Sequence, residues 1–149
     1  MDSILKKETI KYLEESFDET VKLIEEICKI PAPSGKEERR AEYVKDYMES
    51  FGAKGVYIDQ ALNVVYPYNC DGKDDIVVFM AHTDTVFPDM TYPMPFSRDE
   101  KNLYSPGVGD DVACLAKLLI VAKYVTINNL KANVRLFNPN RTPFIVVNR

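Results

Sequence analysis

The stretch Ile76-Val77-Val78-Phe79-Met80-Ala81-His82-Thr83-Asp84 decides the fold, because a continuous apolar run changes at once into polar residues. A short apolar run with polar residues on both sides is typical of a strand that is buried on both faces. In open α/β sheets, the residues just beyond the carboxyl end of such a strand line the crevice where ligands bind. The sequence therefore predicts an α/β fold with a central strand over 76–80 and His82 and Asp84 at its functional end.

Two amphipathic helices are predicted before this strand. Apolar residues at three- and four-residue steps indicate a helix over 4–30, which the prolines within 31–33 end. Ser34 followed three residues later by Glu37 is a capping-box signature, and it predicts a second helix that reaches Gly52.

The rest of the chain alternates short strand-like runs with one more helix. The apolar run 112–122 predicts a buried helix, capped by Asp110 or Asp111. The proline-rich segment 87–106 predicts an irregular loop with at most one short extended piece, near 103–104. The runs that predict further strands are 56–58, 62–66 and 134–137, and a last short apolar run, 144–147, follows a break at 138–143.

The composition fits one globular domain. The chain has 149 residues, a hydrophobic fraction of 46% and a net charge of -4, with no basic stripe typical of nucleic-acid binding. No apolar run has the length of about 18 residues that a membrane span needs. The N-terminus carries acids and lacks the apolar region of a secretory signal, and the three widely spaced cysteines suggest no disulfide framework. We therefore expect a cytoplasmic protein that binds neither nucleic acid nor membranes.

The charges are unevenly distributed. All 23 acids lie in residues 1–111, whereas residues 112–149 contain six Lys and Arg residues and no acid. A nucleic-acid arm is disfavoured, because this region is too apolar. We predict that residues 1–137 form the N-terminal part of a catalytic domain and that residues 138–149 are an atypical tail, with foreign origin and disorder as the two explanations.

The polar residues after the predicted central strand suggest a metal site. The imidazole of His82 can supply a nitrogen to Zn²⁺, and the carboxylate of Asp84 can orient that ring. Gly107 and Gly109 allow a tight turn before Asp110, which brings a further carboxylate. Two simpler interpretations stay open, since a lone His is more often a hydrogen-bonded loop residue and an Asp pair can be a helix cap.

Three segments carry a family resemblance: 30–37 (IPAPSGKE), 79–86 (FMAHTDTV) and 104–113 (YSPGVGDDVA). They resemble the co-catalytic zinc peptidase family that includes peptidase T, aminoacylase and succinyl-diaminopimelate desuccinylase, and the peptidase T-like branch most of all. The resemblance implies a truncated three-layer α/β/α catalytic domain whose mixed sheet is flanked by helices. It also implies metal-dependent hydrolysis of peptide bonds in small peptides, of the tripeptide aminopeptidase type.

The same resemblance assigns roles to individual residues. His82 would bind one zinc ion, Asp110 would bridge two, and Asp84 would be the catalytic residue that assists His82. It further implies a cis peptide bond between Asp110 and Asp111. The family next presents a strand and a Glu-Glu pair, but 138–141 (NPNR) stands at that place, and the last His ligand and the inserted domain are missing too.

These departures predict an inactive fragment that binds zinc weakly or in part, because a two-metal site needs more ligands and a base. A frameshift or an artificial boundary would explain the acid-free end. The alternative is a non-catalytic α/β module that acts by oligomerisation or partner binding, with homo-oligomers forming through an exposed sheet edge. A small peptidase completed by a second copy is disfavoured, since each copy offers the same single His.

Overall fold

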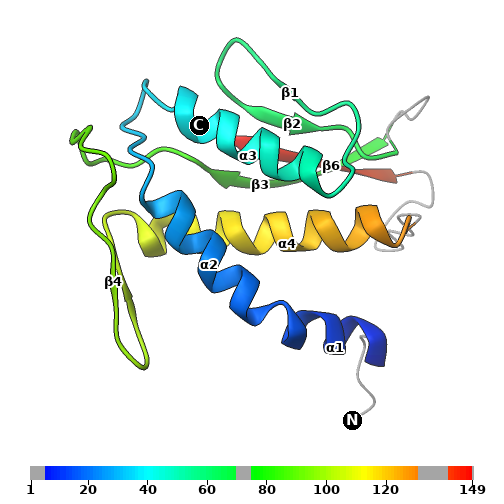
Figure 1. Ribbon diagram of the computed structural model, residues 1–149. Coiled ribbons are helices and arrows are strands. Elements are labelled where there is room, and N and C mark those ends of the chain that lie inside the picture. The colour runs from blue at the N-terminus through cyan, green and yellow to red at the C-terminus, as the bar shows by residue number, and fades with distance from the viewer. Residues whose placement is uncertain (1–5, 70–74, 131–140, 149) are drawn as a thin grey trace.

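The computed structural model describes residues 6–69, 75–130 and 141–148 (Figure 1). Its α-helices are α1 (Lys7–Glu15), α2 (Phe17–Cys28), α3 (Glu38–Ser50) and α4 (Ala113–Ile127). Its strands are β1 (Tyr57–Ile58), β2 (Val64–Tyr66), β3 (Asp75–His82), β4 (Ser97–Arg98), β5 (Leu103–Tyr104) and β6 (Arg141–Asn148). A π-helical turn, η1 (Val108–Val112), leads directly into α4.

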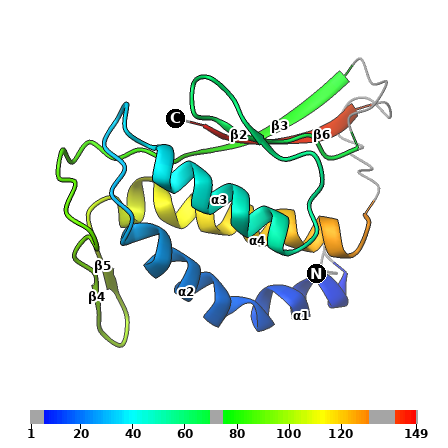
Figure 2. The ribbon, with the colours of Figure 1, turned by 45° about the horizontal axis from the view of Figure 1, so that its top comes forward.

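The main sheet has four strands in the order β1-β2-β6-β3. Strand β6 pairs antiparallel with β2 and parallel with β3, so the sheet is mixed. The four helices lie on the same side of this sheet (Figure 2). This arrangement confirms the predicted α/β class with a mixed sheet and helices.

Strand β3 was predicted as a fully buried central strand, and this part of the prediction is wrong. It is the outermost strand of the described sheet, and Val78, Phe79 and Met80 are 46%, 47% and 60% exposed. Burial on both faces needs helices on both sides, whereas the described helices cover one side only. The apolar run therefore predicted the strand correctly but not its surroundings.

The helix predicted over 4–30 is two helices with a break at Ser16. The Ser16 hydroxyl donates to the carbonyl of Tyr12 at 2.6 Å, and the Ser16 backbone N–H donates to the same oxygen at 2.9 Å. A serine that bonds back to the preceding turn in this way tends to bend a helix. The bend separates α1, which has no buried residue, from α2, which packs into the core.

The core lies where α2, α3 and α4 meet the sheet. Each fully buried Leu, Ile, Val or Met side chain contributes about 1.5–3 kcal/mol by leaving water. Helix α4 was predicted to be buried, but only one face is: Leu115, Ala116, Leu119, Ile120 and Ala122 are buried, whereas Val121 is 46% and Ile127 53% exposed. The apolar side chains at 0% exposure are Ile27, Ala41, Val44, Met48, Val64, Leu115, Ala116, Leu119 and Ala122.

The shorter predicted elements have mixed outcomes. The runs 56–58 and 62–66 form the predicted hairpin as β1 and β2, and β5 is the extended piece predicted near 103–104. The prediction allowed at most one extended piece in 87–106 and is wrong there, because β5 pairs with a second strand, β4. Residues 141–148, placed in the atypical tail, form β6, whereas the strand predicted over 134–137 lies outside the described residues. In the described ranges no helix is both long and apolar enough to span a membrane.

Candidate metal centre

The candidate site forms where β3 ends. His82 is the last residue of β3, and the loop before α4 brings Asp110 to it from another part of the chain. The two ring nitrogens face different carboxylates: Nδ1 lies 3.1 Å from Asp84 Oδ1, and Nε2 lies 3.0 Å from Asp110 Oδ1. The structure therefore brings together His82, Asp84 and Asp110, the three residues to which the sequence assigned the site.

Asp84 is fixed on both sides. Its Oδ1 and its backbone oxygen each lie 3.1 Å from His82 Nδ1, and its other carboxylate oxygen accepts a hydrogen bond from the Ser34 hydroxyl. Such a carboxylate holds the proton on Nδ1 and leaves Nε2 free to act as a ligand. The Ser34 contact replaces the predicted capping box, because α3 begins at Glu38 without a side-chain cap.

Asp111 contacts the same residue through the backbone. Its Oδ2 accepts a hydrogen bond from the His82 N–H at 3.2 Å. Helix α4 begins at Ala113 without a side-chain cap, so the prediction that Asp110 or Asp111 caps this helix is wrong. Both carboxylates face the end of β3 instead, and the peptide bond between them is cis, as the family resemblance implied.

The carboxylates also change the acidity of the imidazole. Burial lowers the pKa of His82, but hydrogen bonding to Asp110 and the negative charges of Asp111 and Asp84 outweigh it, so the pKa is raised above its ordinary value. An electronegative pocket of this kind favours a cation. The raised pKa of His82 is therefore what is expected in a site that binds a metal ion or another positive group.

The donor set fits part of a zinc site. An imidazole nitrogen and a carboxylate oxygen are ligands that zinc takes, and both face a cavity of about 380 Å³ that Thr85, Gly107 and Val108 also line. The Asp110 side chain is 92% exposed and so is open to a ligand. Within residues 6–69, 75–130 and 141–148, however, no group of three or more His, Cys, Asp or Glu residues is arranged to hold a metal. The residues present would supply two protein ligands.

Three contacts to this site were missed in the sequence, those of Ser34, Arg40 and Asp111. Arg40 is 1% exposed and donates to the carbonyl of Thr83, between His82 and Asp84. A signal was available, because Arg40 continues the apolar stripe of α3 at the spacing of Ala41, Val44 and Met48. A charged residue on the buried face of a helix is unusual enough to suggest a specific partner.

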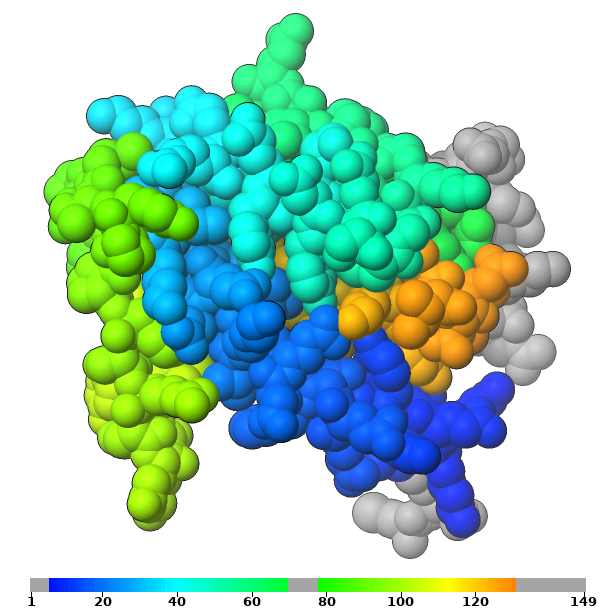
Figure 3. Space-filling model, in the orientation of Figure 1, coloured from blue at the N-terminus to red at the C-terminus, as the bar shows by residue number. Residues whose placement is uncertain are grey.

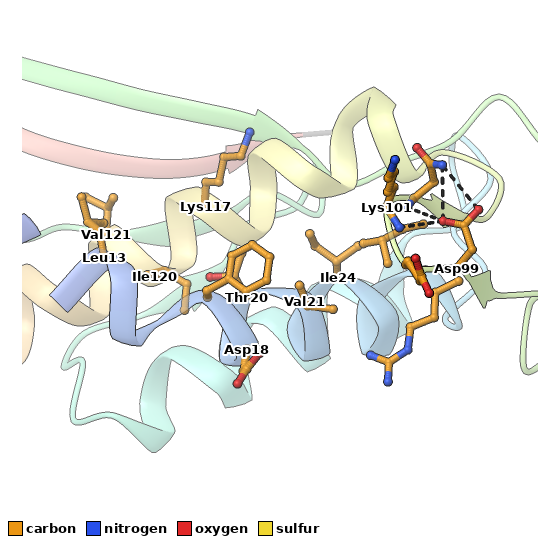
Figure 4. Close-up of a pocket in the computed structure, with 15 residues that line it drawn as sticks. Leu13, Asp18, Thr20, Val21, Ile24, Asp99, Lys101, Lys117, Ile120 and Val121 are labelled. Atoms are coloured by element: carbon orange, nitrogen blue, oxygen red, sulfur yellow. Dashed lines mark hydrogen bonds between the residues drawn. The ribbon is translucent and has the colours of Figure 1, made fainter. Parts of the chain in front are cut away.

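A larger groove lies away from these residues. It has a volume of about 720 Å³ and is bounded by α1, α2, α4 and the turn between β4 and β5 (Figure 4). The hairpin that β4 and β5 form projects from the molecule (Figure 3). Its floor is apolar, with Val21, Ile24 and Ile120, and its rim carries Asp99 and Lys101 (Figure 4). The groove contains no His or Cys, so it is not a second candidate for the metal chemistry.

The chain is similar to known proteins in part of its sequence and in its fold. No protein-family model matches the chain. Over 69 residues it is 36% identical to a putative [LysW]-lysine/[LysW]-ornithine hydrolase of Pyrococcus abyssi, a match that covers 46% of this chain and 20% of that protein. The structure is similar to aminopeptidase PepT of Bacillus cereus, with a TM-score of 0.62, 19% identity and coverage of 87% of this chain and 35% of that one. For human carnosine dipeptidase 1 the TM-score is 0.72 and the identity 15%, with coverage of 95% of this chain and 34% of that one.

The chain thus spans a fifth of the curated relative and about a third of each solved structure. The solved structures agree with it in fold, and the curated relative agrees with it in sequence. The predicted resemblance to peptidase T-like proteins is thus confirmed at the level of the fold, because the chain has the α/β fold of part of the catalytic domain of these peptidases.

Proposed function

We propose that this chain is part of the catalytic domain of a metal-dependent hydrolase that cleaves peptide bonds in small peptides. In this proposal His82 and Asp110 would hold zinc, Asp110 being the carboxylate shared in a two-metal site, and Asp84 would assist His82. The observation that carries the proposal is the line of contacts from Asp84 through the two nitrogens of His82 to Asp110, at 3.1 and 3.0 Å. In protein zinc sites, the imidazole that ligates the metal usually donates its other N–H to a carboxylate or a similar acceptor.

Asp84, His82 and Asp110 would have different roles in zinc binding. With zinc bound, Asp84 would accept the proton of His82 Nδ1, and Nε2, which lies on the side of Asp110, would be the nitrogen left to ligate the metal. Asp110 adds a negatively charged oxygen that solvent and ligands can reach. Zinc, when bound, would supply Lewis acidity toward the carbonyl of the scissile bond.

The 149-residue chain by itself is proposed to lack hydrolytic activity. Hydrolysis needs a general base within reach of the nucleophile. Asp84, Asp110 and Asp111 are already engaged with His82, and the sequence contains no Asp or Glu after Asp111. Metal binding by two protein ligands would also be weak.

The substrate class rests on the names of similar proteins. The two solved structures are an aminopeptidase and a dipeptidase, which supports small peptides and, with the sequence resemblance, a tripeptide. The curated relative is named as a hydrolase of [LysW]-lysine and [LysW]-ornithine, so these compounds are the second substrate to test.

Cobalt titration tests the metal ligands. Co²⁺ added to the purified chain without a His tag should produce visible absorption, and His82→Ala and Asp110→Asn should each abolish it or weaken binding at least about tenfold. Asp46→Asn is the matched control, since this exposed carboxylate lies on α3 and forms no ion pair with the described residues. Equal affinity of Asp110→Asn and Asp46→Asn would contradict the assignment, and zinc-dependent cleavage of a tripeptide by the chain would contradict its proposed inactivity.

A non-catalytic module that forms oligomers is the second candidate. It is favoured by β3, which is the outermost strand of the described sheet and whose Met80 is 60% exposed. Unpaired strand edges recruit strands from other chains. Light scattering after size-exclusion chromatography should then give a mass above 17.0 kDa that Val78→Lys lowers, whereas a monomer at all concentrations would exclude this candidate.

A further inference from the structure

A continuous apolar stripe runs along α1 and α2 on the side of the large groove. Its members follow one another at steps of four, four and three residues, which is the spacing of one helix face. They are Leu13, Phe17, Val21 and Ile24, and all of them line the groove, so the bend at Ser16 does not interrupt the stripe. Ile120 and Val121 of α4 lie beside the stripe and form the other wall (Figure 4).

The stripe is covered at one end only. Ile24 is buried in the core, whereas Leu13 is 44% and Phe17 66% exposed. Val121 on the other wall is 46% exposed. Single exposed apolar side chains are normal on a protein surface, but several that line one groove indicate an interaction site. The groove therefore has an open apolar end formed by Leu13, Phe17 and Val121.

Helix α1 also favours a partner at this end. It has nine residues, and none of them is buried. Isolated helices shorter than about 12–15 residues are marginal in water, because helices in proteins depend on tertiary packing. Thr9 forms a hydrogen bond with Tyr124 of α4, and the rings of Tyr12 and Tyr124 lie 4.6 Å apart, but Leu13 stays exposed. A partner that covers Leu13 and Phe17 would stabilise α1 together with the groove.

The charges around the groove indicate which partner fits. Three acids and three bases line it: Asp18, Asp99, Glu100, Arg98, Lys101 and Lys117. None of the six forms an ion pair with the described residues. A partner with charges of one sign would meet repulsion from half of this rim, whereas a second copy brings both signs. In an interface with two-fold symmetry, an acid of one copy can approach a base of the other.

We propose that this groove binds a second copy of the chain, in a dimer with two-fold symmetry. The exposed end of the α1–α2 stripe of each copy packs into the groove of the other, so that both copies use the same surface. An amphipathic helix that lies in an apolar groove, with anchors at three- and four-residue steps, is a common mode of recognition. This interface is separate from the outer edge of β3 and does not depend on zinc.

Phe17→Lys tests the apolar part of the interface. The mass of the wild-type chain, from light scattering after size-exclusion chromatography, should rise with concentration from 17.0 kDa to twice that value. Phe17→Lys places a charge at the open end and should raise the dissociation constant of the dimer at least about tenfold. The matched control is Met90→Lys, since Met90 is 42% exposed and lies outside the groove, and it should leave the dimer intact.

Lys117→Glu tests the charges. It would leave four acids and two bases around the groove, so two copies should repel each other and the dimer should be weaker. Lys54→Glu makes the same change in net charge at an exposed residue outside the groove, and it should leave the dimer unchanged. Equal dimerisation of these two variants would contradict a charge-complementary interface at this surface.

Hydrogen exchange measured by mass spectrometry locates the interface. A higher protein concentration should slow exchange in peptides that cover residues 13–24 and 117–121, and it should leave peptides of β3 unchanged. A wild-type chain that is monomeric at all concentrations would overturn the proposal, as would a Phe17→Lys dimer as stable as the wild-type dimer. A dimer that Val78→Lys dissociates and Phe17→Lys does not would place the contact at the edge of β3 and would overturn it too.

Discussion

Replacing Gly107 with Ala should destabilise the chain by about 2–5 kcal/mol, through two separable effects. Gly107 has φ +74°, and an L-residue in this left-handed region costs about 1–2 kcal/mol. An added Cβ would also lie 2.5 Å from Thr85 Cγ2, closer than such atoms come, and Thr85 is only 5% exposed and has little room to move. Overpacking of this kind costs about 1–3 kcal/mol.

Two other glycines separate these effects. Gly52 has φ +91° but nothing within 4 Å of the position of an added Cβ, so Gly52→Ala should lose only the conformational part, about 1–2 kcal/mol. Gly109 has neither a positive φ nor a close neighbour, and Gly109→Ala should change the free energy of unfolding by less than about 0.5 kcal/mol.

A double-mutant cycle with Thr85→Ser isolates the clash. The serine keeps the hydroxyl and removes Cγ2, at a cost of about 1 kcal/mol for the lost buried methyl group. The remaining neighbours of the new Cβ, Thr85 Cβ at 3.5 Å and Asp110 O at 3.4 Å, are at ordinary contact distances. The double mutant should therefore lose at least about 1 kcal/mol less than the sum of the single mutants.

The assay is urea unfolding followed by far-ultraviolet circular dichroism, which suits a chain without Trp. The reasoning would be refuted by strictly additive free energies in the cycle, or by equal losses in Gly107→Ala and Gly52→Ala. Either result would mean that the approach of Gly107 to Thr85 is looser than the structure has it.

Three further predictions concern the core, an ion pair and the thiols. Leu119→Ala, at a side chain with 0% exposure, should cost about 2–5 kcal/mol in urea unfolding. Burial raises the pKa of Glu19, but hydrogen bonds from Lys123 at 2.6 and 2.8 Å outweigh it and the pKa is lowered. The wild type should therefore be more stable than Glu19→Gln above pH 4.5, and this difference in the free energy of unfolding should disappear as the pH falls through the lowered pKa of Glu19. Unfolding curves recorded across that pH range measure the difference. Iodoacetamide should modify the exposed Cys114 of the folded chain and reach Cys28, which is 1% exposed and whose pKa burial raises, only after unfolding, as peptide mass spectrometry would report. Equal labelling of both thiols in the folded chain would contradict this burial.

The sequence predicted well what depends on local pattern. Periodicity located α2, α3, α4 and β3, and the spacing of His82, Asp84 and Asp110 selected residues that the fold brings together. Polar residues that directly follow a strand must lie at its carboxyl end, so the position of the site in the fold follows from the strand.

The errors concern choices that distant partners decide. Ser34 looked like a helix cap, but Asp84, 50 residues later, accepts the hydrogen bond from its hydroxyl. Arg40 donates to the carbonyl of Thr83, which lies 43 residues away, and no local pattern contains that carbonyl. Strand β3 has the composition of a buried strand, but only the packing of helices and strands around it determines whether it is covered.

The place of β6 in the sheet has a consequence for how the chain folds. Strands β2 and β3 are not hydrogen-bonded to each other, because β6 lies between them and pairs with both. During synthesis the β1–β2 hairpin and β3 must therefore wait without a shared neighbour until residues 141–148 have left the ribosome. Pairing over such a sequence distance closes a large loop and slows folding. The main sheet is thus completed only after residues 141–148 have been synthesised, and until then the unpaired strand edges are exposed to other chains.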